Sequence, residues 1–310
     1  MQSNEIWKNW GSFDPFEQRA HRFREEMRPL LFQYLGIRED SRILDAGCGT
    51  GVLARFLSGG LTSGHADGFD INAGAIAQGT EILRESGLSE KVTLRVDDGF
   101  ALSFKDDSFD AVTNYTYLGV VSDPEACLRE MIRVCRPGGT VSSIVATNSI
   151  PNIHWQGDYP IEGMDELQSL ADRENVIFSF FASKSRGKSL HQAGQDMRTA
   201  KLFRRCDLTH IRMHPFAHLI CYDDDRLPFE QRRELALGEL EEDIAWIAGR
   251  YNEFREIYDA HGFTKQDMDR LLMLMKRKLS YLEAHFGEDE AYEWHAGLNF
   301  IVTGIKKANG

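Results

Sequence analysis

Apolar and polar positions change their period several times along the chain, and the first half alternates short apolar runs with helical stretches. Five runs have the length and residue types of buried strands, and they fall at 42–46, 66–71, 92–96, 109–113 and 140–146. Helices are predicted between them at 52–57, 75–86 and 125–134. Strands that alternate with helices indicate βαβ units, so the sequence predicts an α/β fold whose mostly parallel sheet is covered by helices on both faces.

The N-terminal segment precedes this alternation. Its apolar residues from Phe23 to Tyr34 recur at spacings near 3.6, which predicts helix over residues 5–35. We therefore expect residues 1–36 to form an N-terminal helical cap.

After residue 147 the regular alternation ends. Residues 148–190 are irregular and are predicted to form a loop insertion. A helix is predicted at 195–206 and a strand at 208–221. Two amphipathic helices follow at 237–258 and 268–286, with a break between them at His261-Gly262, and a last strand is predicted at 298–305. The two additional strands make the expected sheet seven-stranded.

These elements divide the chain into a sheet core at 37–222 and 297–310 and a helical-hairpin insertion at 223–296. In open α/β sheets, ligands bind beyond the carboxyl ends of the parallel strands. Both insertions leave from that edge, so we expect them to form a ligand pocket and its lid. The apolar stripes of the hairpin indicate helix packing first and a homodimer interface as the alternative.

Three histidines in the strand at 208–221 stand four residues apart, at His210, His214 and His218. Strand alternation places them on a polar face and predicts that Ile211 and Met213 face the core. Three ligands spread along one strand are too far apart to converge on one ion, so no metal is predicted.

Composition narrows the class of partner. The chain has 310 residues with 36 Lys and Arg against 48 Asp and Glu, a net charge of −12 that disfavours nucleic acid. Its five cysteines lack CxxC spacing, so neither a disulfide framework nor a zinc site is expected. No apolar run approaches the ~20 residues of a membrane span, and the N-terminus lacks the apolar stretch of a signal peptide. A cytoplasmic protein is expected.

A glycine-rich loop follows the first predicted strand and opens a helix. Gly47, Gly49 and Gly51 allow a ligand to approach the backbone closely, and amide groups at the start of a helix can bind a polar group. Asp45 precedes this loop and can attract a cationic group, while Asp70 ends the second strand and can accept hydrogen bonds from both hydroxyls of a ribose. The third glycine of a dinucleotide fingerprint is absent, which disfavours an NAD-dependent enzyme.

Four segments, in this order, resemble motifs of class I S-adenosylmethionine-dependent methyltransferases. ILDAGCGTG at 43–51 is similar to their first motif, and GFDIN at 68–72 is similar to the second. VDDGFALSF at 96–104, followed by SFD at 108–110, resembles the segment whose aspartate holds the adenine amino group. RVCRPGG at 133–139 resembles the turn before the fifth strand. The resemblance is greatest to the small-molecule methyltransferases of ubiquinone and menaquinone biosynthesis.

This resemblance implies a Rossmann-like seven-stranded sheet and S-adenosylmethionine as the cofactor. It assigns the adenine contact to Asp98, or to Asp97 if the register shifts by one. The residues implied to bind the cofactor are Asp45, Gly47, Cys48, Gly49, Gly51, Asp70, Ile71, Asp98, Gly99, Phe100, Asn114 and Tyr115.

Methyl transfer to a small, aromatic or apolar acceptor is the function that we predict. Such transfer depends mainly on proximity and orientation, with help from a general base for some acceptors. The candidate catalytic residues are His154, Tyr115 and His295. The residues expected in the acceptor pocket are His154, Trp155, Tyr159, Trp294 and His295.

Two alternatives to this function stay open. A histidine pair that some relatives carry after the fourth strand is replaced here by Leu118-Gly119-Val120-Val121, which leaves open a non-catalytic cofactor-binding or regulatory module. A protein methyltransferase is the second alternative. The Asn-Tyr-Thr-Tyr sequence at 114–117 lacks the Pro-Pro of enzymes that methylate DNA bases, and this disfavours nucleic-acid methylation.

Overall fold

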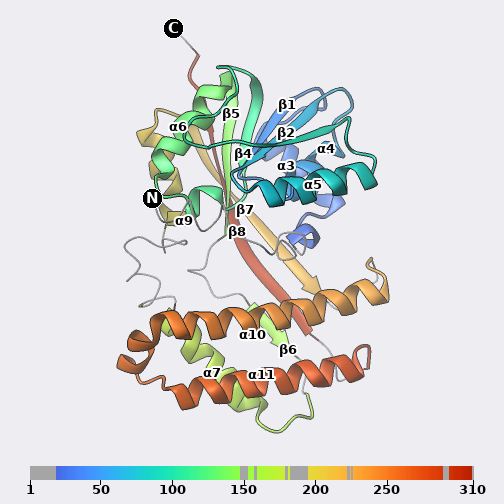
Figure 1. Ribbon diagram of the computed structural model, residues 1–310, viewed down its shortest axis with the longest axis vertical. Coiled ribbons are helices and arrows are strands. Elements are labelled where there is room, and N and C mark those ends of the chain that lie inside the picture. The colour runs from blue at the N-terminus through green and yellow to red at the C-terminus, as the bar shows by residue number, and fades with distance from the viewer. Residues whose placement is uncertain are drawn as a thin grey trace. The chain divides into compact units, whose positions relative to one another are not determined.

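Figure 1 shows the computed structural model of the chain. It describes residues 19–146, 153–156, 159–178, 181, 195–221, 224, 226–288 and 293–308. The chain divides into two compact units. The first holds residues 1–147, 188–216 and 298–310, and the second holds 148–187 and 217–297.

The first unit is built on a sheet whose strands run in the order β3-β2-β1-β4-β5-β8, with β7 also pairing with β8. Neighbouring strands from β3 to β5 are parallel, and β8 is antiparallel to β5. The strands are β1 (Arg42–Ala46), β2 (His65–Asp70), β3 (Val92–Val96), β4 (Phe109–Asn114), β5 (Cys135–Ala146), β7 (Thr209–Cys221) and β8 (Glu293–Ile305). The predicted Rossmann-like, mostly parallel sheet is therefore confirmed.

The sheet differs from the prediction at its far edge. An eighth strand within the described residues, β6 (Ile153–Gln156), pairs with the start of β8. The strand β6 was not predicted. The strand β8 begins at Glu293, five residues before its predicted start at residue 298, because its first residues pair with β6.

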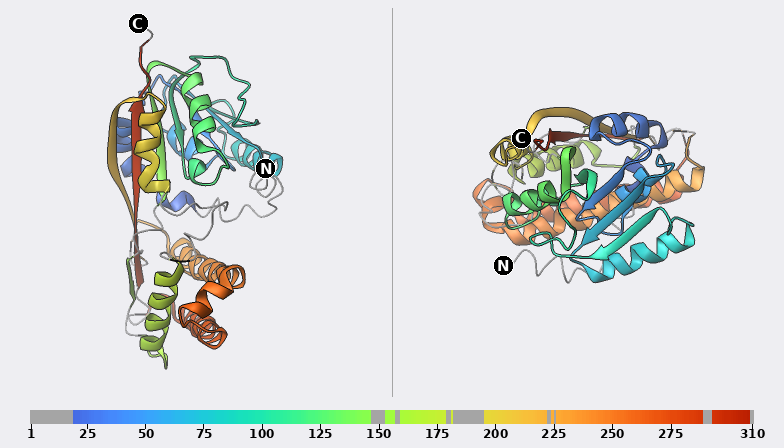
Figure 2. Two further views of the ribbon diagram at one scale, coloured as in Figure 1. Left: turned by 90° about the vertical axis from the view of Figure 1, so that its left-hand side faces the viewer. Right: turned by 90° about the horizontal axis from the view of Figure 1, so that it is seen from above.

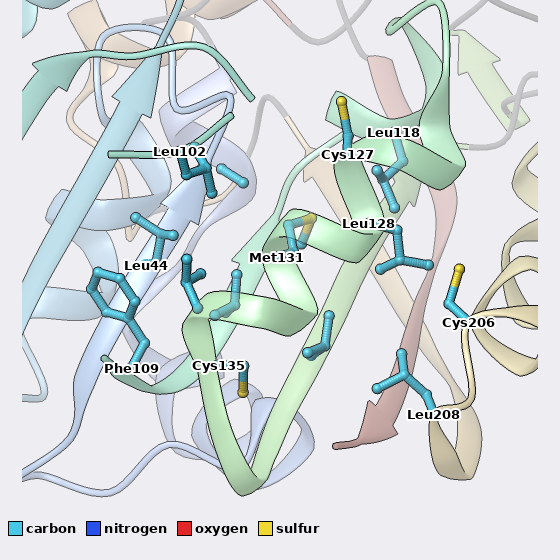
Figure 3. Close-up of a cluster of buried hydrophobic side chains, with 14 of the residues drawn as sticks. Leu44, Leu102, Phe109, Leu118, Cys127, Leu128, Met131, Cys135, Cys206 and Leu208 are labelled. Atoms are coloured by element: carbon cyan, nitrogen blue, oxygen red, sulfur yellow. The ribbon is translucent and has the colours of Figure 1, made fainter. Parts of the chain in front are cut away.

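Helices cover both faces of this sheet (Figure 2). They are α3 (Arg28–Leu35), α4 (Val52–Ser58), α5 (Ala73–Glu85), α6 (Pro124–Val134) and α9 (Gln195–Arg205). Successive residues of a strand point to opposite faces. Ile43 accordingly packs with α3 and α4, whereas Leu44 packs with Leu128 and Met131 of α6 (Figure 3).

The described part of the N-terminal segment is less helical than predicted. Two short 3-10 turns, η1 (Arg19–Arg22) and η2 (Glu25–Met27), precede α3. Pro29 lies in the first turn of α3, the only place where a helix accepts proline without losing a hydrogen bond. Between η1 and η2, Arg24 has an extended backbone conformation, which interrupts the helical segment. This break lets Phe23 pack into the core.

The predicted inward face of β7 is confirmed at Ile211, which packs against the apolar cluster of α6 and α9, but it is wrong at Met213. Met213 is 47% exposed, whereas Phe216, on the opposite face, is 2% exposed and stacks on Phe23 at 5.8 Å. His214 shares the face of Phe216 and stacks on Tyr34 of α3 at 4.1 Å. Burial of one large aromatic ring therefore outweighs the short apolar alternation that suggested the other face.

The second unit is helical. It contains α7 (Met164–Ile177), α10 (Phe229–Ala260) and α11 (Lys265–His285), which pack against one another. The predicted hairpin is present, but α7 lies in a segment that was expected to be a loop of the core. Its buried Leu167, Leu170 and Ile177 pack with Tyr258 and with residues of α11. Residues 148–187 consequently belong to the same unit as the hairpin, although β6 within them pairs with β8.

Candidate functional site

A pocket lies at the carboxyl ends of β1, β2 and β4, in the first unit. Backbone loops and apolar side chains form most of its wall. It is lined by Asp45, Gly47, Cys48, Gly49, Val52, Leu53, Phe69, Asp70, Ile71, Asn72, Ala75, Asp98, Gly99, Phe100, Tyr115, Thr116, Tyr117, Val120 and Val121. Every residue that we expected to bind the cofactor lines this pocket except Gly51 and Asn114.

The glycine loop between β1 and α4 forms one wall of the pocket. Gly47, Gly49 and Gly51 all have positive φ angles, of 65°, 56° and 83°, which favour glycine. The turn is fastened to β2, because the Cys48 amide donates to the Phe69 carbonyl and the Gly49 amide donates to Asp70 Oδ2, each at 2.9 Å. Gly51 precedes the first turn of α4 and shapes the loop without lining the pocket.

Asp70 stands at the end of β2 with both carboxylate oxygens engaged by the backbone. Oδ2 accepts from the Gly49 amide, and Oδ1 accepts from the Asn72 amide at 2.9 Å. A carboxylate oxygen can accept more than one hydrogen bond, so each oxygen keeps capacity for a ligand hydroxyl. Burial raises the pKa of Asp70, although the amide hydrogen bonds of Asn72 and Gly49 oppose this effect.

Asp45 is a second buried carboxyl group on the pocket wall. It is 2% exposed, and its Oδ2 accepts from the Ala54 amide at 3.2 Å. Burial raises the pKa of Asp45 to about 8, and the nearby charge of Asp70 adds to the increase. A cationic ligand in this pocket would offset that cost and favour the ionised carboxylate.

The loop after β3 brings Asp98, Gly99 and Phe100 to the pocket. The carboxylate of Asp97 is committed to its own loop, because it accepts from the Asp98 amide and from both the amide and the hydroxyl of Ser103. Asp98 lines the pocket and Asp97 does not. The structure therefore favours Asp98 for the contact that sequence analysis left open between the two.

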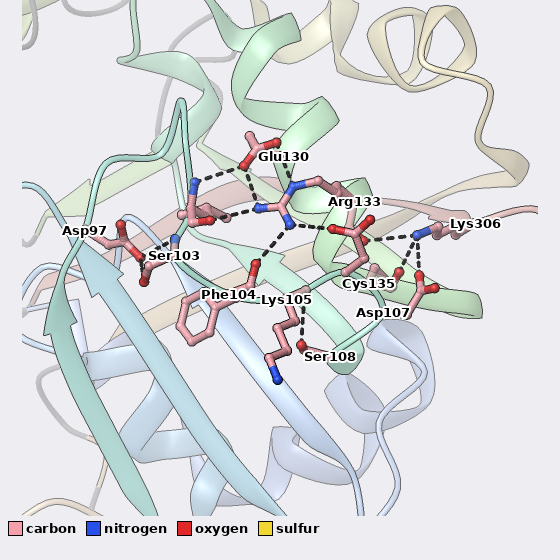
Figure 4. Close-up of polar contacts among 12 residues, drawn as sticks. Asp97, Ser103, Phe104, Lys105, Asp107, Ser108, Glu130, Arg133, Cys135 and Lys306 are labelled. Atoms are coloured by element: carbon pink, nitrogen blue, oxygen red, sulfur yellow. Dashed lines mark hydrogen bonds and ion pairs between the residues drawn. The ribbon is translucent and has the colours of Figure 1, made fainter.

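Arg133 of α6 holds the continuation of this loop (Figure 4). Its guanidinium donates to the Leu102 and Phe104 carbonyls, each at 2.9 Å, and pairs with Glu130. Glu130 in turn accepts from the Leu102 amide. Lys306 fastens the far end of the loop through Asp107 at 2.6 Å. The RVCRPGG segment thus contributes a clamp on the loop that carries Asp98.

Replacing Arg133 by methionine should lower the free energy of unfolding by about 2 kcal/mol, because the two carbonyls lose their donor. Urea unfolding of the purified protein measures this difference. Arg129→Met on the same helix is the control, since exposed Arg129 pairs with Glu125 alone in the described contacts and should change stability by about 0.5 kcal/mol or less. Equal losses in the two variants would show that Arg133 is not a clamp.

Asn114 ends β4 and Tyr115 follows it, but the two side chains lie in different surroundings. Asn114 is fully buried, donating to the Ser142 carbonyl at 3.1 Å and accepting from the Ser143 hydroxyl at 3.0 Å, so it joins β4 to β5. Tyr115 lines the pocket, and its hydroxyl accepts a hydrogen bond from Arg22 Nη1 at 3.1 Å. The N-terminal segment therefore fixes the Tyr115 side chain beside the pocket.

Sequence analysis did not assign nine pocket residues to cofactor binding. They are Val52, Leu53, Phe69, Asn72, Ala75, Thr116, Tyr117, Val120 and Val121. Extending each motif by one helical turn toward the C-terminus would have found six of the nine but not Phe69, Val120 or Val121. Tyr117 is the largest of these six, and its ring lies close to two separate loops of the pocket.

The residues expected to contact the acceptor belong to the second unit. The β6–β8 pairing places His154 opposite His295 and Trp155 opposite Trp294 in the backbone register. Tyr159 is buried, packs edge-on against Tyr281 of α11 and contacts Leu282. Tyr159 therefore contributes to the packing of the helical unit, and it is not among the residues that line the pocket of the first unit.

The residues that the structure describes contain no group of three or more His, Cys, Asp or Glu side chains placed to hold a metal ion. Over the same residues, no helix has both the length and the apolar character needed to cross a membrane.

Comparison with known proteins identifies the domain that carries the pocket. Residues 43–139 match the family model of the methyltransferase domain. Methyltransferase GfsG of Streptomyces halstedii is 26% identical over 172 residues, which are 55% of this chain and 59% of that protein. The ubiquinone/menaquinone biosynthesis C-methyltransferase UbiE of Pectobacterium carotovorum is 38% identical over 105 residues, 34% of this chain and 42% of that protein. The chain thus spans about half the length of these relatives.

Solved structures share the fold at low sequence identity. The [4+2]-cyclase SpnF superposes with a TM-score of 0.53 at 16% identity, covering 100% of this chain and 98% of that chain. Phosphoethanolamine N-methyltransferase 2 of Haemonchus contortus, in complex with phosphomonomethylethanolamine and S-adenosylhomocysteine, has a TM-score of 0.50 at 17% identity, covering 99% and 61%. Residues 43–139 therefore match a methyltransferase domain, and the sheet that contains them has the Rossmann-like fold of such domains.

Proposed function

We propose that this chain binds S-adenosylmethionine in the pocket of its first unit and transfers the methyl group to a small aromatic or apolar acceptor. The observation that carries the proposal is the half-buried Asp70 carboxylate, which accepts from the Gly49 and Asn72 amides at the edge of a pocket walled in part by the glycine loop. The matching domain and the methyltransferase activity named for its relatives support it.

The residues present fit this cofactor. Gly47 and Gly49 allow close approach along the backbone, and Asp70 offers two acceptor oxygens for the ribose hydroxyls. Asp98 offers an acceptor for the adenine amino group, and Phe100 offers an apolar surface beside the ring. Asp45 supplies the negative charge that suits a cation.

S-adenosylmethionine supplies a methyl group bonded to a positively charged sulfur. The protein's contribution is to place an acceptor in line with that bond and to exclude water. Val52, Leu53, Val120 and Val121 give the pocket an apolar wall suited to this task. Tyr115 places a hydroxyl group at the same wall, where it can orient a polar acceptor atom.

Label transfer tests the proposal. The protein incubated with methyl-labelled S-adenosylmethionine should transfer label to at least one member of a panel of phenols, catechols, amines and thiols. Tyr115→Phe should lower kcat at least about tenfold for an acceptor with an ionisable proton, because the orienting hydroxyl is gone, and should change cofactor affinity little. Cofactor binding without transfer to any small molecule or peptide would favour a non-catalytic module, and transfer to peptides alone would favour a protein methyltransferase.

The acceptor-binding role of residues 148–190 and 223–296 stays a prediction, as does a homodimer through the helical insertion. So does the part assigned to His154 and His295. The label-transfer panel will provide the acceptor with which these residues can be tested by substitution.

A further inference from the structure

The ring of Tyr117 lies between two loops of the pocket, the glycine loop after β1 and the loop after β3, which we propose to bind the nucleoside. Tyr117 begins the short turn η3 (Tyr117–Gly119), which follows β4. Its ring lies so close to Gly47 that a Cβ atom there would overlap it, and a Cβ atom on Gly99 would overlap its hydroxyl. Between these loops the ring meets Phe69 of β2 edge-on at 5.9 Å.

This position coincides with the expected path of the cofactor. Gly47 belongs to the loop after β1, and Gly99 belongs to the loop that carries Asp98 after β3. A glycine in a ligand-binding loop gives room for a ligand to approach the backbone. At both of these glycines, Tyr117 fills the room. The side chain thus stands where an adenosine that reaches from Asp70 to Asp98 would contact the loops.

The polar contact that holds Tyr117 there is weak. Its hydroxyl donates to Cys127 Sγ at 3.3 Å, and a thiol sulfur is a poor acceptor. Burial of the hydroxyl raises the pKa of Tyr117 well above its ordinary value, so the group stays neutral and forms no ion pair in this place. The ring also contacts Phe69 edge-on and packs against the apolar cluster that includes Leu128, and these apolar contacts are the attraction that opening must overcome.

The residues before and after Tyr117 in the chain favour a change in the conformation of the turn. Thr116 has φ of 62°, a left-handed conformation that is strained for a β-branched residue. Gly119 closes the turn, and no atom lies within 4 Å of the position where its Cβ would be. A strained residue before Tyr117 and a glycine after it allow the turn to rotate and to relieve the strain.

We infer that Tyr117 occupies the adenosine part of the pocket and must swing out, by rotation of residues 116–119, before S-adenosylmethionine or its product can bind. This inference rests on the proposed function and deepens it. It makes Tyr117 a residue that sets the rate and affinity of cofactor entry. The open form is then the minor one, and the apparent affinity is reduced by its fraction.

Stopped-flow binding of S-adenosylhomocysteine tests this displacement. For the unmodified protein, the observed rate should level off at high ligand concentration, because opening precedes binding. Tyr117→Ala should lose this plateau and bind about tenfold more tightly, since no ring has to leave. Tyr117→Phe keeps the ring but loses the bond to Cys127, so it should keep a plateau at a higher rate.

Tyr34→Ala is the control, because it removes a tyrosine of the first unit that does not line the pocket, and its plateau should remain. Thermal unfolding of each variant verifies that it is folded. Weaker binding by Tyr117→Ala, together with an observed rate of the unmodified protein that rises linearly without limit, would overturn the inference and leave the proposed function intact. Absence of binding by both proteins would instead overturn the proposed function and the inference with it.

Discussion

Replacing Asp70 by alanine should lower the affinity for S-adenosylmethionine by at least about 30-fold, because two charge-assisted hydrogen bonds to the ribose hydroxyls are lost. The loss is large because this carboxylate is already oriented by the Gly49 and Asn72 amides, so binding pays little to order it. Titration calorimetry with S-adenosylmethionine and with S-adenosylhomocysteine measures the effect.

Two further variants make this result specific. Asp40→Ala removes the same charge from an exposed site just before β1, where Asp40 pairs with Arg38, and it should leave affinity unchanged. Asp70→Asn keeps one oxygen for a backbone amide but turns an NH2 group toward the other, so it should lose most of the affinity, with a loss of stability that thermal unfolding measures. If Asp70→Ala bound as tightly as Asp40→Ala, the ribose would not be held by Asp70.

Replacing Asp45 by asparagine should stabilise the protein and weaken cofactor binding. The folded protein raises the pKa of Asp45 from 3.8 to about 8, so the folded state holds this proton more tightly than the unfolded state does. The free energy of unfolding therefore falls as pH rises from about 4 to about 8, and it changes no further above that pH. Asparagine does not ionise and so removes this loss. We expect the free energy of unfolding, measured with urea at pH 8, to rise by about 2 kcal/mol.

The same proton governs binding of a cation. The affinity for S-adenosylmethionine, whose sulfur is positively charged, should fall as the pH drops below about 8, because Asp45 becomes neutral. The affinity for S-adenosylhomocysteine, whose sulfur is uncharged, should fall less. Asp45→Asn should remove this difference. Asp67→Asn is the control for stability, since buried Asp67 pairs with Arg42 and Arg95 and its replacement should destabilise. A loss of stability in Asp45→Asn equal to that of Asp67→Asn would contradict the account.

The strands of the sheet could be predicted because their apolar runs are short, buried and closed by polar or glycine residues. The runs at 42–46 and 92–96 match β1 and β3 at both ends, and the end of β2 at Asp70 lies within one residue of the prediction. Carboxylates that follow such strands meet at one edge of a parallel sheet. For this reason Asp45 and Asp70 could be placed together from the strand pattern, whereas Asp98 was assigned by the resemblance of its segment to the methyltransferase motif.

Other features depend on tertiary contacts that leave little local trace. α7 escaped prediction because its buried leucines are few and most of its residues are polar. Asn114 resembled a ligand contact by position, yet its amide is used between β4 and β5. The place of Tyr117 follows from the left-handed conformation of Thr116, which no residue pattern indicates for a β-branched side chain.

The central claim is tested most directly by a crystal structure of the protein grown with S-adenosylhomocysteine. The account predicts adenosine between the glycine loop and the loop of Asp98, with both ribose hydroxyls hydrogen-bonded to Asp70. Adenosine bound elsewhere on the chain, or a ribose that makes no contact with Asp70, would contradict it.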